Sequence, residues 1–222
     1  MDPELTVFYD VDTQRDFLLP EGALSVPGAE RIIPRLAELT QLARRLKLRI
    51  IASTDCHQAT DPELQRNGGQ YPDHCMVATA GQRKIDETAP LKPIYVPNRR
   101  LTSDEIDAIL AHRGEIVFEK QQFDVFAGNV NANFLLPRLL QNYADVVVYG
   151  VYTEVCVRDA LAGLLKTKTN LRLHLVTDAT ADIGTDGAIY RRQWQNAGIH
   201  LLTVAELKAR LKEGPRSAAT RS

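Results

Sequence analysis

A short apolar strand that leads at once into an amphipathic helix, within residues 145–165, most constrains what this chain can fold into. Residues 146–149 form a run without any charged residue, which is typical of a strand buried on both faces of a sheet. After Gly150, apolar residues recur at close to helical spacing: Val155, Val157, Ala160, Leu161, Leu164 and Leu165. A buried strand that continues into such a helix is typical of a parallel sheet covered by helices.

Cys156 lies just inside the start of that predicted helix, directly beyond the carboxyl end of the strand. Thr153 can cap the helix, and Glu154 is expected in its first turn. Free backbone N–H groups and the positive end of the helix dipole favour a thiolate at this position, and the same groups could hold an oxyanion. A small core residue is the alternative interpretation, and the position alone does not decide between the two.

The rest of the chain alternates between strand and helix patterns. Strand patterns lie at residues 5–11, 47–52, 92–96, 115–119, 172–177 and 199–203, and helix patterns at 29–46, 103–112, 130–143, 186–197 and 204–211. The alternation predicts a single α/β domain over residues 1–213, with a mostly parallel sheet covered by helices on both faces. The polar tail at residues 214–222 is expected to be disordered.

Charge and cysteine usage exclude several classes of function. A net charge of −1 gives no basis for binding nucleic acid or a membrane surface, so we expect neither as a partner. No apolar run approaches the roughly 18 residues of a membrane-spanning helix, and the acidic first ten residues do not look like a signal peptide. Three cysteines without framework spacing indicate reduced thiols, so we expect a cytoplasmic protein, which we also expect to be a homo-oligomer.

Chemically active residues follow several of the predicted strands, and they are Asp12, Asp55, Lys120, Cys156 and Asp178. Ligands of parallel α/β sheets bind beyond the carboxyl ends of strands, so these side chains would share a pocket if their strands are neighbours. Asp12 could take the proton of the Cys156 thiol and return it to a leaving amine, while Lys120 would favour the thiolate. An aspartate at a strand end is often only a turn former, and a lysine there is often only a residue at the edge of the sheet. Asp12, Lys120 and Cys156 together at three strand ends favour catalysis.

A second group of polar residues lies just before and within a long irregular stretch, residues 58–91. Asp55 and His57 are two residues apart, and Glu63 and His74 follow within the stretch. Carboxylates and imidazoles suit a divalent transition metal such as zinc, iron or manganese. The Asp-x-His pair alone would favour a solvated polar loop, but irregular stretches of this length are usually functional.

Five segments, taken in order, resemble the isochorismatase-like cysteine hydrolases. Residues 11–17 (VDTQRDF) look like the D-x-Q-x-D-F signature of that family, and residues 55–57 match its D-x-H metal pair. Residues 71–75 (YPDHC) resemble the W-P-x-H-C segment of its nicotinamidase branch. Lys120 follows a strand as the catalytic lysine of the family does, and residues 150–157 (GVYTEVCV) resemble the nucleophile segment G-x-x-T-[DE]-x-C-V.

This resemblance covers most of the chain and implies a three-layer α/β/α sandwich with a mostly parallel six-stranded sheet. It also implies a catalytic triad of Asp12, Lys120 and Cys156, in which the cysteine forms a thioester with the acyl group of a small amide. A cis peptide bond is expected between Val151 and Tyr152. The N–H groups of Tyr152 and Cys156 would then hold the oxyanion.

The nicotinamidase/pyrazinamidase branch converts nicotinamide to nicotinate and ammonia, a step of NAD salvage, and uses a divalent metal. The implied metal ligands are Asp55, His57, Glu63 and His74. Zinc is the expected metal, with iron and manganese as alternatives. The metal would bind the pyridine nitrogen of the substrate, and Phe17 and Tyr71 would flank the aromatic ring.

Three positions depart from the pattern of that branch. Tyr71 stands where a tryptophan is usual, Tyr152 where the residue is often small, and members of the family vary at the position of Glu63. A related cysteine hydrolase that acts on another small amide is therefore one alternative. A non-catalytic module that uses Cys156 as a sensor thiol is another, although a sensor would not need Asp12 as a proton shuttle.

Overall fold

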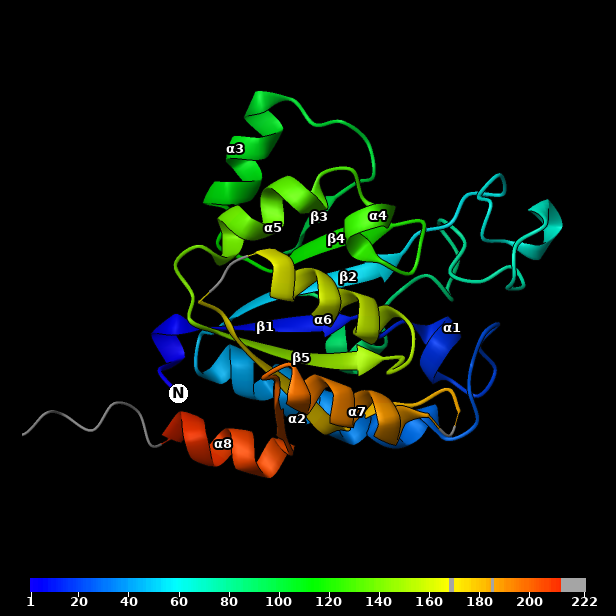
Figure 1. Ribbon diagram of the computed structural model, residues 1–222. Helices are drawn as coiled ribbons and strands as arrows, with labels where there is room; N and C mark the ends of the chain where they lie inside the picture. Colours follow the sequence, from blue (N-terminus) through cyan, green and yellow to red (C-terminus); the bar gives the residue numbers. More distant parts are fainter. Residues whose placement is uncertain (168–169, 185, 213–222) are drawn as a thin grey trace, which may run out of the picture.

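A single sheet of seven parallel strands organises the computed structural model, which describes residues 1–167, 170–184 and 186–212 (Figure 1). The strand order is β3-β4-β2-β1-β5-β6-β7, and every neighbouring pair is parallel. The strands are β1 (Thr6–Val11), β2 (Arg49–Asp55), β3 (Ile94–Val96), β4 (Ile116–Lys120), β5 (Asp145–Val151), β6 (Arg172–Ala181) and β7 (His200–Leu202).

The expected strand number of six is wrong by one. The two edge strands, β3 and β7, have three residues each, and both pair in parallel with a longer neighbour. Strands as short as these are weak signals in a sequence, although both fall inside strand patterns that the sequence does contain.

Helices cover both faces of the sheet, so the three-layer α/β/α sandwich is confirmed. Alternate residues of β1 show the two faces: Val7, Tyr9 and Val11 belong to one apolar core and Phe8 to the other. On the first face lie α3 (Ser103–Ala111), α4 (Val125–Gly128), α5 (Ala132–Leu140), α6 (Cys156–Thr167) and α7 (Gly187–Asn196). On the second lie α1 (Arg15–Leu18), α2 (Ile33–Arg45) and α8 (Val204–Lys212).

Two local predictions around the strand ends are wrong. Helix α6 begins at Cys156 itself, so Thr153 and Glu154 lie in the turn before it, and Glu154 instead accepts hydrogen bonds from the backbone of Ile183 and Gly184. Strand β6 continues to Ala181, so Asp178 lies inside the strand rather than beyond it. Its carboxylate accepts a hydrogen bond from the backbone of α8 and does not belong to the site.

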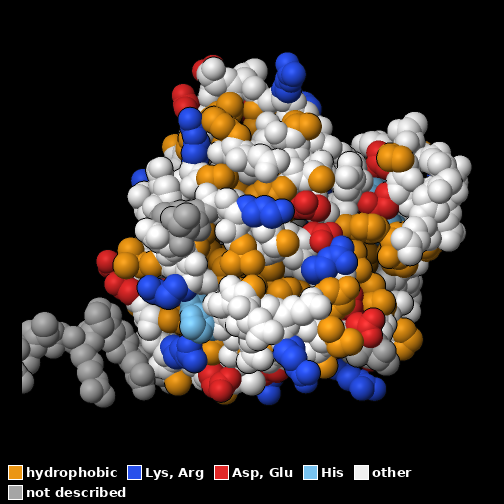
Figure 2. Space-filling view, in the orientation of Figure 1, with side chains coloured by type: hydrophobic (Ala, Val, Ile, Leu, Met, Phe, Trp, Pro, Cys, Tyr) orange, Lys and Arg blue, Asp and Glu red, His pale blue; other side chains and the backbone are white. Residues whose placement is uncertain are grey.

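A long loop between β2 and β3 projects beyond the carboxyl ends of the strands (Figure 1). It has two short 3₁₀ turns, Gln65–Asn67 and Asp86–Thr88, and apolar side chains gather beside it in the space-filling view (Figure 2). No helix within the described residues is long and apolar enough to cross a membrane. The tail at residues 214–222, expected to be disordered, lies outside the described residues.

Candidate active site and metal centre

The four central strands bring the predicted catalytic residues to one edge of the sheet. Strand β1 lies between β2 and β5, and β4 lies beside β2, where Asp55 pairs with Lys120 in register. Asp12 follows β1 directly, and Cys156 begins the helix that follows β5. Four residues that lie far apart in the sequence therefore meet beyond the carboxyl ends of adjacent strands, as parallel α/β sheets place their sites.

Asp12, Lys120 and Cys156 form a buried group around the lysine ammonium. The Lys120 Nζ lies 3.0 Å from the Asp12 Oδ2 and 3.6 Å from the Cys156 Sγ, and it also pairs with the Asp55 Oδ1. Asp12 and Lys120 are at most 1% exposed, and Cys156 is 6% exposed. Asp12 has a φ of +50°, which is uncommon for a residue other than glycine and is found at functional sites.

Burial sets the protonation of this group. It raises the pKa of Asp12, and Asp55 adds to the effect, while Lys120 opposes it. It also raises the pKa of the Cys156 thiol well above its usual range, against the attraction of Lys120. Burial lowers the pKa of Lys120, but the charges of Asp12 and Asp55 outweigh this effect. They raise the pKa well above its usual value and keep the lysine charged. A proton can therefore move between a thiol and a carboxyl group that both hold it readily.

The turn between β5 and α6 presents two free backbone donors beside the thiol. The peptide bond between Val151 and Tyr152 is cis. Within the described part of the chain, neither the N–H of Tyr152 nor that of Cys156 donates a hydrogen bond. Gly150 precedes this turn with a φ of +122°, and a β-carbon there would collide with the carbonyl group of Val11. The two N–H groups can hold a developing oxyanion.

The four predicted metal ligands also come together. One ligand atom from each of Asp55, His57, Glu63 and His74 lies within 4.8 Å of the other three. The His57 Nε2 is 3.9 Å from the Asp55 Oδ2 and 3.7 Å from the Glu63 Oε1, and the His74 Nε2 is 3.8 Å from each of the same two oxygens.

These four ligand atoms are among the buried polar atoms that have no hydrogen-bond partner within the described residues. Asp55 Oδ2, His57 Nε2, Glu63 Oε1 and His74 Nε2 are all buried, and none has a partner among the described residues. A buried polar atom without a partner is costly, and four that face one another are explained by a cation. Two imidazoles and two carboxylates fit zinc, iron or manganese, so the residues present suit such a metal.

A further set of contacts orients the ligands. The His57 Nδ1 lies 3.0 Å from the Asp61 Oδ2, and the His74 Nδ1 lies 2.7 Å from the carbonyl oxygen of Pro72, which leaves the Nε2 of each ring for a metal. The buried Gln14 amide donates to the carbonyl oxygen of Asp55 and accepts from its N–H group. No residue pattern marks Asp61 for this role, whereas Gln14 is the glutamine of the D-x-Q-x-D-F segment, to which the sequence alone assigned no role.

Electrostatics of the metal-ligand carboxylates also favour a cation. Burial opposes the ionisation of Asp55, but the Lys120 ammonium and the nearby His74 and His57 rings outweigh it and lower the pKa of Asp55 to about 2. Burial and the charge of Asp55 raise the pKa of Glu63 to about 7. The two carboxylates repel each other without a cation between them, and a divalent metal would remove that repulsion.

A cavity of about 180 Å³ joins the thiol to the metal ligands. Phe17 and Tyr71, the two predicted ring contacts, both line it, and so does Tyr152. The predicted site residues Asp55, His74 and Cys156 line it as well, and the walls that were not predicted come from Leu24, Ser25, Val26, Phe123, Val155 and Ile183. The hydroxyl of Tyr152 donates to the carbonyl group of Phe17 and accepts from the N–H of Val26. It therefore ties the wall formed by residues 17–26 to the turn before Cys156.

Comparisons with known proteins find a matching domain family and a similar enzyme. The model of the isochorismatase domain matches residues 9–206. Nicotinamidase of Saccharomyces cerevisiae is 21% identical over 212 residues, which cover 88% of this chain and 97% of the yeast protein.

Solved structures of similar fold include two amidases. The pyrazinamidase of Pyrococcus horikoshii, solved in complex with zinc, has a TM-score of 0.69 and 25% identity, and the match covers 90% of this chain and 99% of that one. N-carbamoylsarcosine amidase from Thermoplasma acidophilum has a TM-score of 0.67 and 24% identity, with 93% and 98% covered. Because the matched domain spans most of its length, this chain belongs to the isochorismatase family.

Proposed function

We propose that this protein is an amidohydrolase that converts nicotinamide to nicotinate and ammonia, and that it also accepts pyrazinamide. The observation that supports this most is one small apolar cavity with the Cys156 thiol at one side and an imidazole–carboxylate metal group at the other. The similarity to a yeast nicotinamidase and a zinc-bound pyrazinamidase points to the same activity.

In this proposal Cys156 is the nucleophile. Asp12 takes the proton of the thiol, and the Lys120 ammonium, 3.0 Å from Asp12 and 3.6 Å from the sulfur, stabilises the thiolate that forms. The sulfur attacks the amide carbon, and the N–H groups of Tyr152 and Cys156 hold the oxyanion. Asp12 then gives its proton to the departing ammonia, and a water molecule, deprotonated by Asp12, cleaves the thioester.

The metal would be held by Asp55, His57, Glu63 and His74. When bound, it would supply a Lewis-acid position for a ring nitrogen of the substrate, and zinc is the proposed metal. The protein contributes the rest of the orientation. The rings of Tyr71 and Phe123 pack edge to face, with their centroids 5.1 Å apart. The centroid of the Phe17 ring lies 5.6 Å from that of the His74 ring. Aromatic walls therefore surround the space beside the metal ligands.

The charge of the cavity favours an uncharged aromatic amide over an N-carbamoyl amino acid. Among the described residues, no lysine or arginine lines it, and Asp55 is the only carboxylate of its walls. Sarcosine is an amino acid, so N-carbamoylsarcosine has a carboxylate that would meet no cationic side chain in this cavity. Burying that charge without a cationic side chain in the walls would be unfavourable.

Ammonia release from a panel of four amides tests the proposal. Nicotinamide and pyrazinamide should be hydrolysed efficiently, benzamide poorly because it lacks the ring nitrogen, and N-carbamoylsarcosine not at all. If the purified metal-loaded protein prefers N-carbamoylsarcosine, or if benzamide and nicotinamide react equally well, the proposed substrate is wrong. In that case the chain is an amidase of this family with another substrate.

A further inference from the structure

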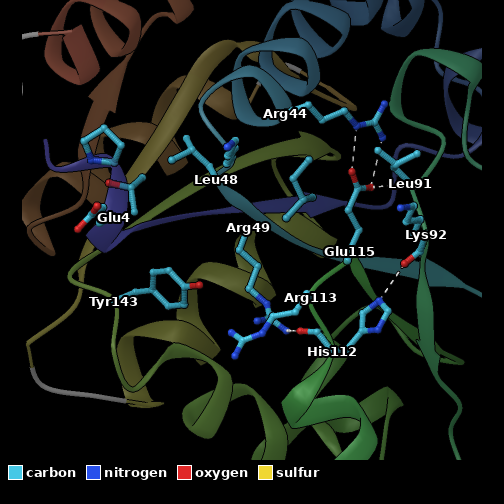
Figure 3. A pocket seen from close by; sticks show the side chains of 15 residues that line it. Glu4, Arg44, Leu48, Arg49, Leu91, Lys92, His112, Arg113, Glu115 and Tyr143 are labelled. Atoms are coloured by element: carbon cyan, nitrogen blue, oxygen red, sulfur yellow. Dashed lines mark hydrogen bonds and ion pairs between the residues drawn. The ribbon is translucent and has the colours of Figure 1, made fainter.

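A larger cavity, of about 690 Å³, opens at the amino end of the sheet, at the opposite end of the strands from the site described above (Figure 3). The segments that lead into β1, β2, β4 and β5 form its walls, with residues such as Glu4, Arg49, Glu115 and Tyr143. Its volume falls within the range of about 300–1,000 Å³ that is usual for small-molecule sites. We refer to it as the amino-edge cavity.

The amino-edge cavity is positively charged. Arg44 and Glu115 neutralise each other in a two-pronged ion pair, with N–O distances of 3.0 and 3.3 Å. The charged side chains that remain are Lys47, Arg49, Lys92, Arg113 and Glu4, of which four are cationic. The whole chain has a net charge of −1, so this accumulation is local. A cavity with an excess of one sign of charge concentrates ligands of the opposite sign.

Most of these cations have no partner in the protein. Among the described residues, the side chains of Lys47, Lys92 and Arg113 make no hydrogen bond or ion pair. Arg49 donates from its Nη2 to the carbonyl oxygen of His112 at 2.9 Å, but its Nε is buried without an acceptor. Charged donors without a protein partner can bind an anionic ligand through charge-assisted hydrogen bonds.

The two lysines also occupy backbone positions that favour glycine. Lys47 has a φ of +57° and Lys92 a φ of +48°. Lys47 follows the end of α2, where the hydrogen bonds from Lys47 to Arg44 and from Leu48 to Ala43 form the turn that most often has glycine at this position. A lysine there lowers stability relative to glycine, and a charge required at the rim of the cavity would explain it.

Arg49 and Arg113 lie where this cavity meets a second one. Both residues also line an adjoining cavity of about 530 Å³, and Figure 3 draws their guanidinium groups close together. Guanidinium groups bind phosphate oxygens in pairs. Leu48, Leu91 and Tyr143 line the same walls and offer apolar contact to the rest of a ligand.

We propose that the amino-edge cavity binds a small organic phosphate with at least two negative charges, such as a nucleoside diphosphate. The phosphates contact Arg49 and Arg113, with Lys47 and Lys92 beside them. The organic part packs against Leu48, Leu91 and Tyr143. This proposal does not depend on the proposed enzymatic activity, because the cavity shares no residue with the catalytic group or the metal ligands.

Calorimetric titration of the full chain with ADP, inorganic pyrophosphate and sulfate, at equal ionic strength, tests the proposal. We expect ADP to bind more tightly than pyrophosphate, and sulfate to bind weakly. Arg113→Gln should weaken ADP binding about tenfold, because a charge-assisted hydrogen bond is lost. The matched control is Arg45→Gln, an exposed arginine at the end of α2 that lines neither cavity, and it should change the affinity less than twofold.

A second variant separates binding from folding. Lys47→Gly should weaken ADP binding while its melting temperature without ligand is no lower than that of the wild type, since glycine accommodates the φ of Lys47. Equal losses in the Arg113 and Arg45 variants, or sulfate binding as tightly as ADP, would show a non-specific charged surface and overturn the proposal. ADP binding no tighter than pyrophosphate would overturn the role of the apolar wall.

Discussion

At the scale of single residues, Asp55 links the two parts of the site. One of its carboxylate oxygens pairs with Lys120, and the other faces the two histidines and Glu63. Its backbone is held in place by the buried amide of Gln14. The thiol group and the metal group therefore share one carboxylate, and a substitution of Asp55 would disturb both.

The nucleophile can be tested with an internal control. Cys156→Ala should reduce amide turnover to background while nicotinamide still binds, because the sulfur makes the bond but does not hold the ring. Cys56→Ala is the control: burial and nearby carboxylates raise the pKa of Cys56 to about 11, and unlike Cys156 its thiol has no lysine among the groups that set this pKa. Rates are measured by ammonia release and binding by calorimetry. Turnover in the Cys156 variant comparable to wild type would rule out the thioester.

Asp61 can be tested as an orienting residue for the metal. Asp61→Ala should lower the affinity for zinc by about 10–100-fold, because the His57 ring loses the acceptor that fixes its orientation. Asp73→Ala is the matched control in the same loop, since the one side chain with which Asp73 pairs among the described residues is the exposed Arg66. Competition with a chromogenic chelator measures both affinities. Equal affinities in the two variants would mean that Asp61 does not support the metal ligand.

At the scale of elements, periodic segments were predictable and short ones were not. The buried run of β5 and the amphipathic pattern of α6 could be recognised because they extend over several turns or a whole strand. Helices α1 and α4 have four residues each, too few to show a helical period, and were missed. The cavity walls at Leu24, Phe123 and Ile183 lie in loops, where position depends on the folded chain and leaves no pattern in the sequence.

The pairing of β5 and β6 predicts a dependence of stability on pH. Burial opposes the ionisation of Asp145, but its hydrogen bonds with His174 and Arg172 outweigh this and lower its pKa to about 2. The folded pKa is below the unfolded one of roughly 3.9, so the ionised form stabilises the fold at neutral pH, and this contribution is lost as the pH falls from about 4 to about 2.

Asp145→Asn should therefore cost about 2 kcal/mol at pH 7 and reduce the loss of stability between pH 4 and pH 2. Urea unfolding at a series of pH values measures both effects. Asp104→Asn, in the exposed first turn of α3, is a suitable control with little effect expected. An unchanged slope in the Asp145 variant would show that another carboxylate causes the acid sensitivity.

At the scale of the whole molecule, the two ends of the sheet have opposite character. The carboxyl end holds the thiol, the metal ligands and their carboxylates, and the amino end holds the cationic amino-edge cavity. Both depend on the strand order, which brings together segments from the whole length of the chain. The homo-oligomer expected from the sequence stays a prediction, which light scattering can check.

The metal should act on binding and stability more than on the thiol. One divalent metal per chain is expected by elemental analysis of protein purified without chelator. Its removal should lower the melting temperature by several degrees, because the metal binds the folded loop, and should raise the KM for nicotinamide. Iodoacetamide should still modify Cys156. Metal-free protein with full activity on nicotinamide would contradict the proposed metal role.

The central place of β1 also has a consequence for the synthesis of the protein. Strand β1 leaves the ribosome before the other strands of the sheet, and its two neighbours are β2 and β5. Strand β5 is made only after β2 and all the residues between Asp55 and Asp145. At 5–20 residues per second, β1 waits roughly 5–20 s with the backbone groups of one edge unpaired. Unpaired edges of this kind promote aggregation. Nascent chains, and products truncated before β5, are therefore the forms of this protein that would most need a chaperone.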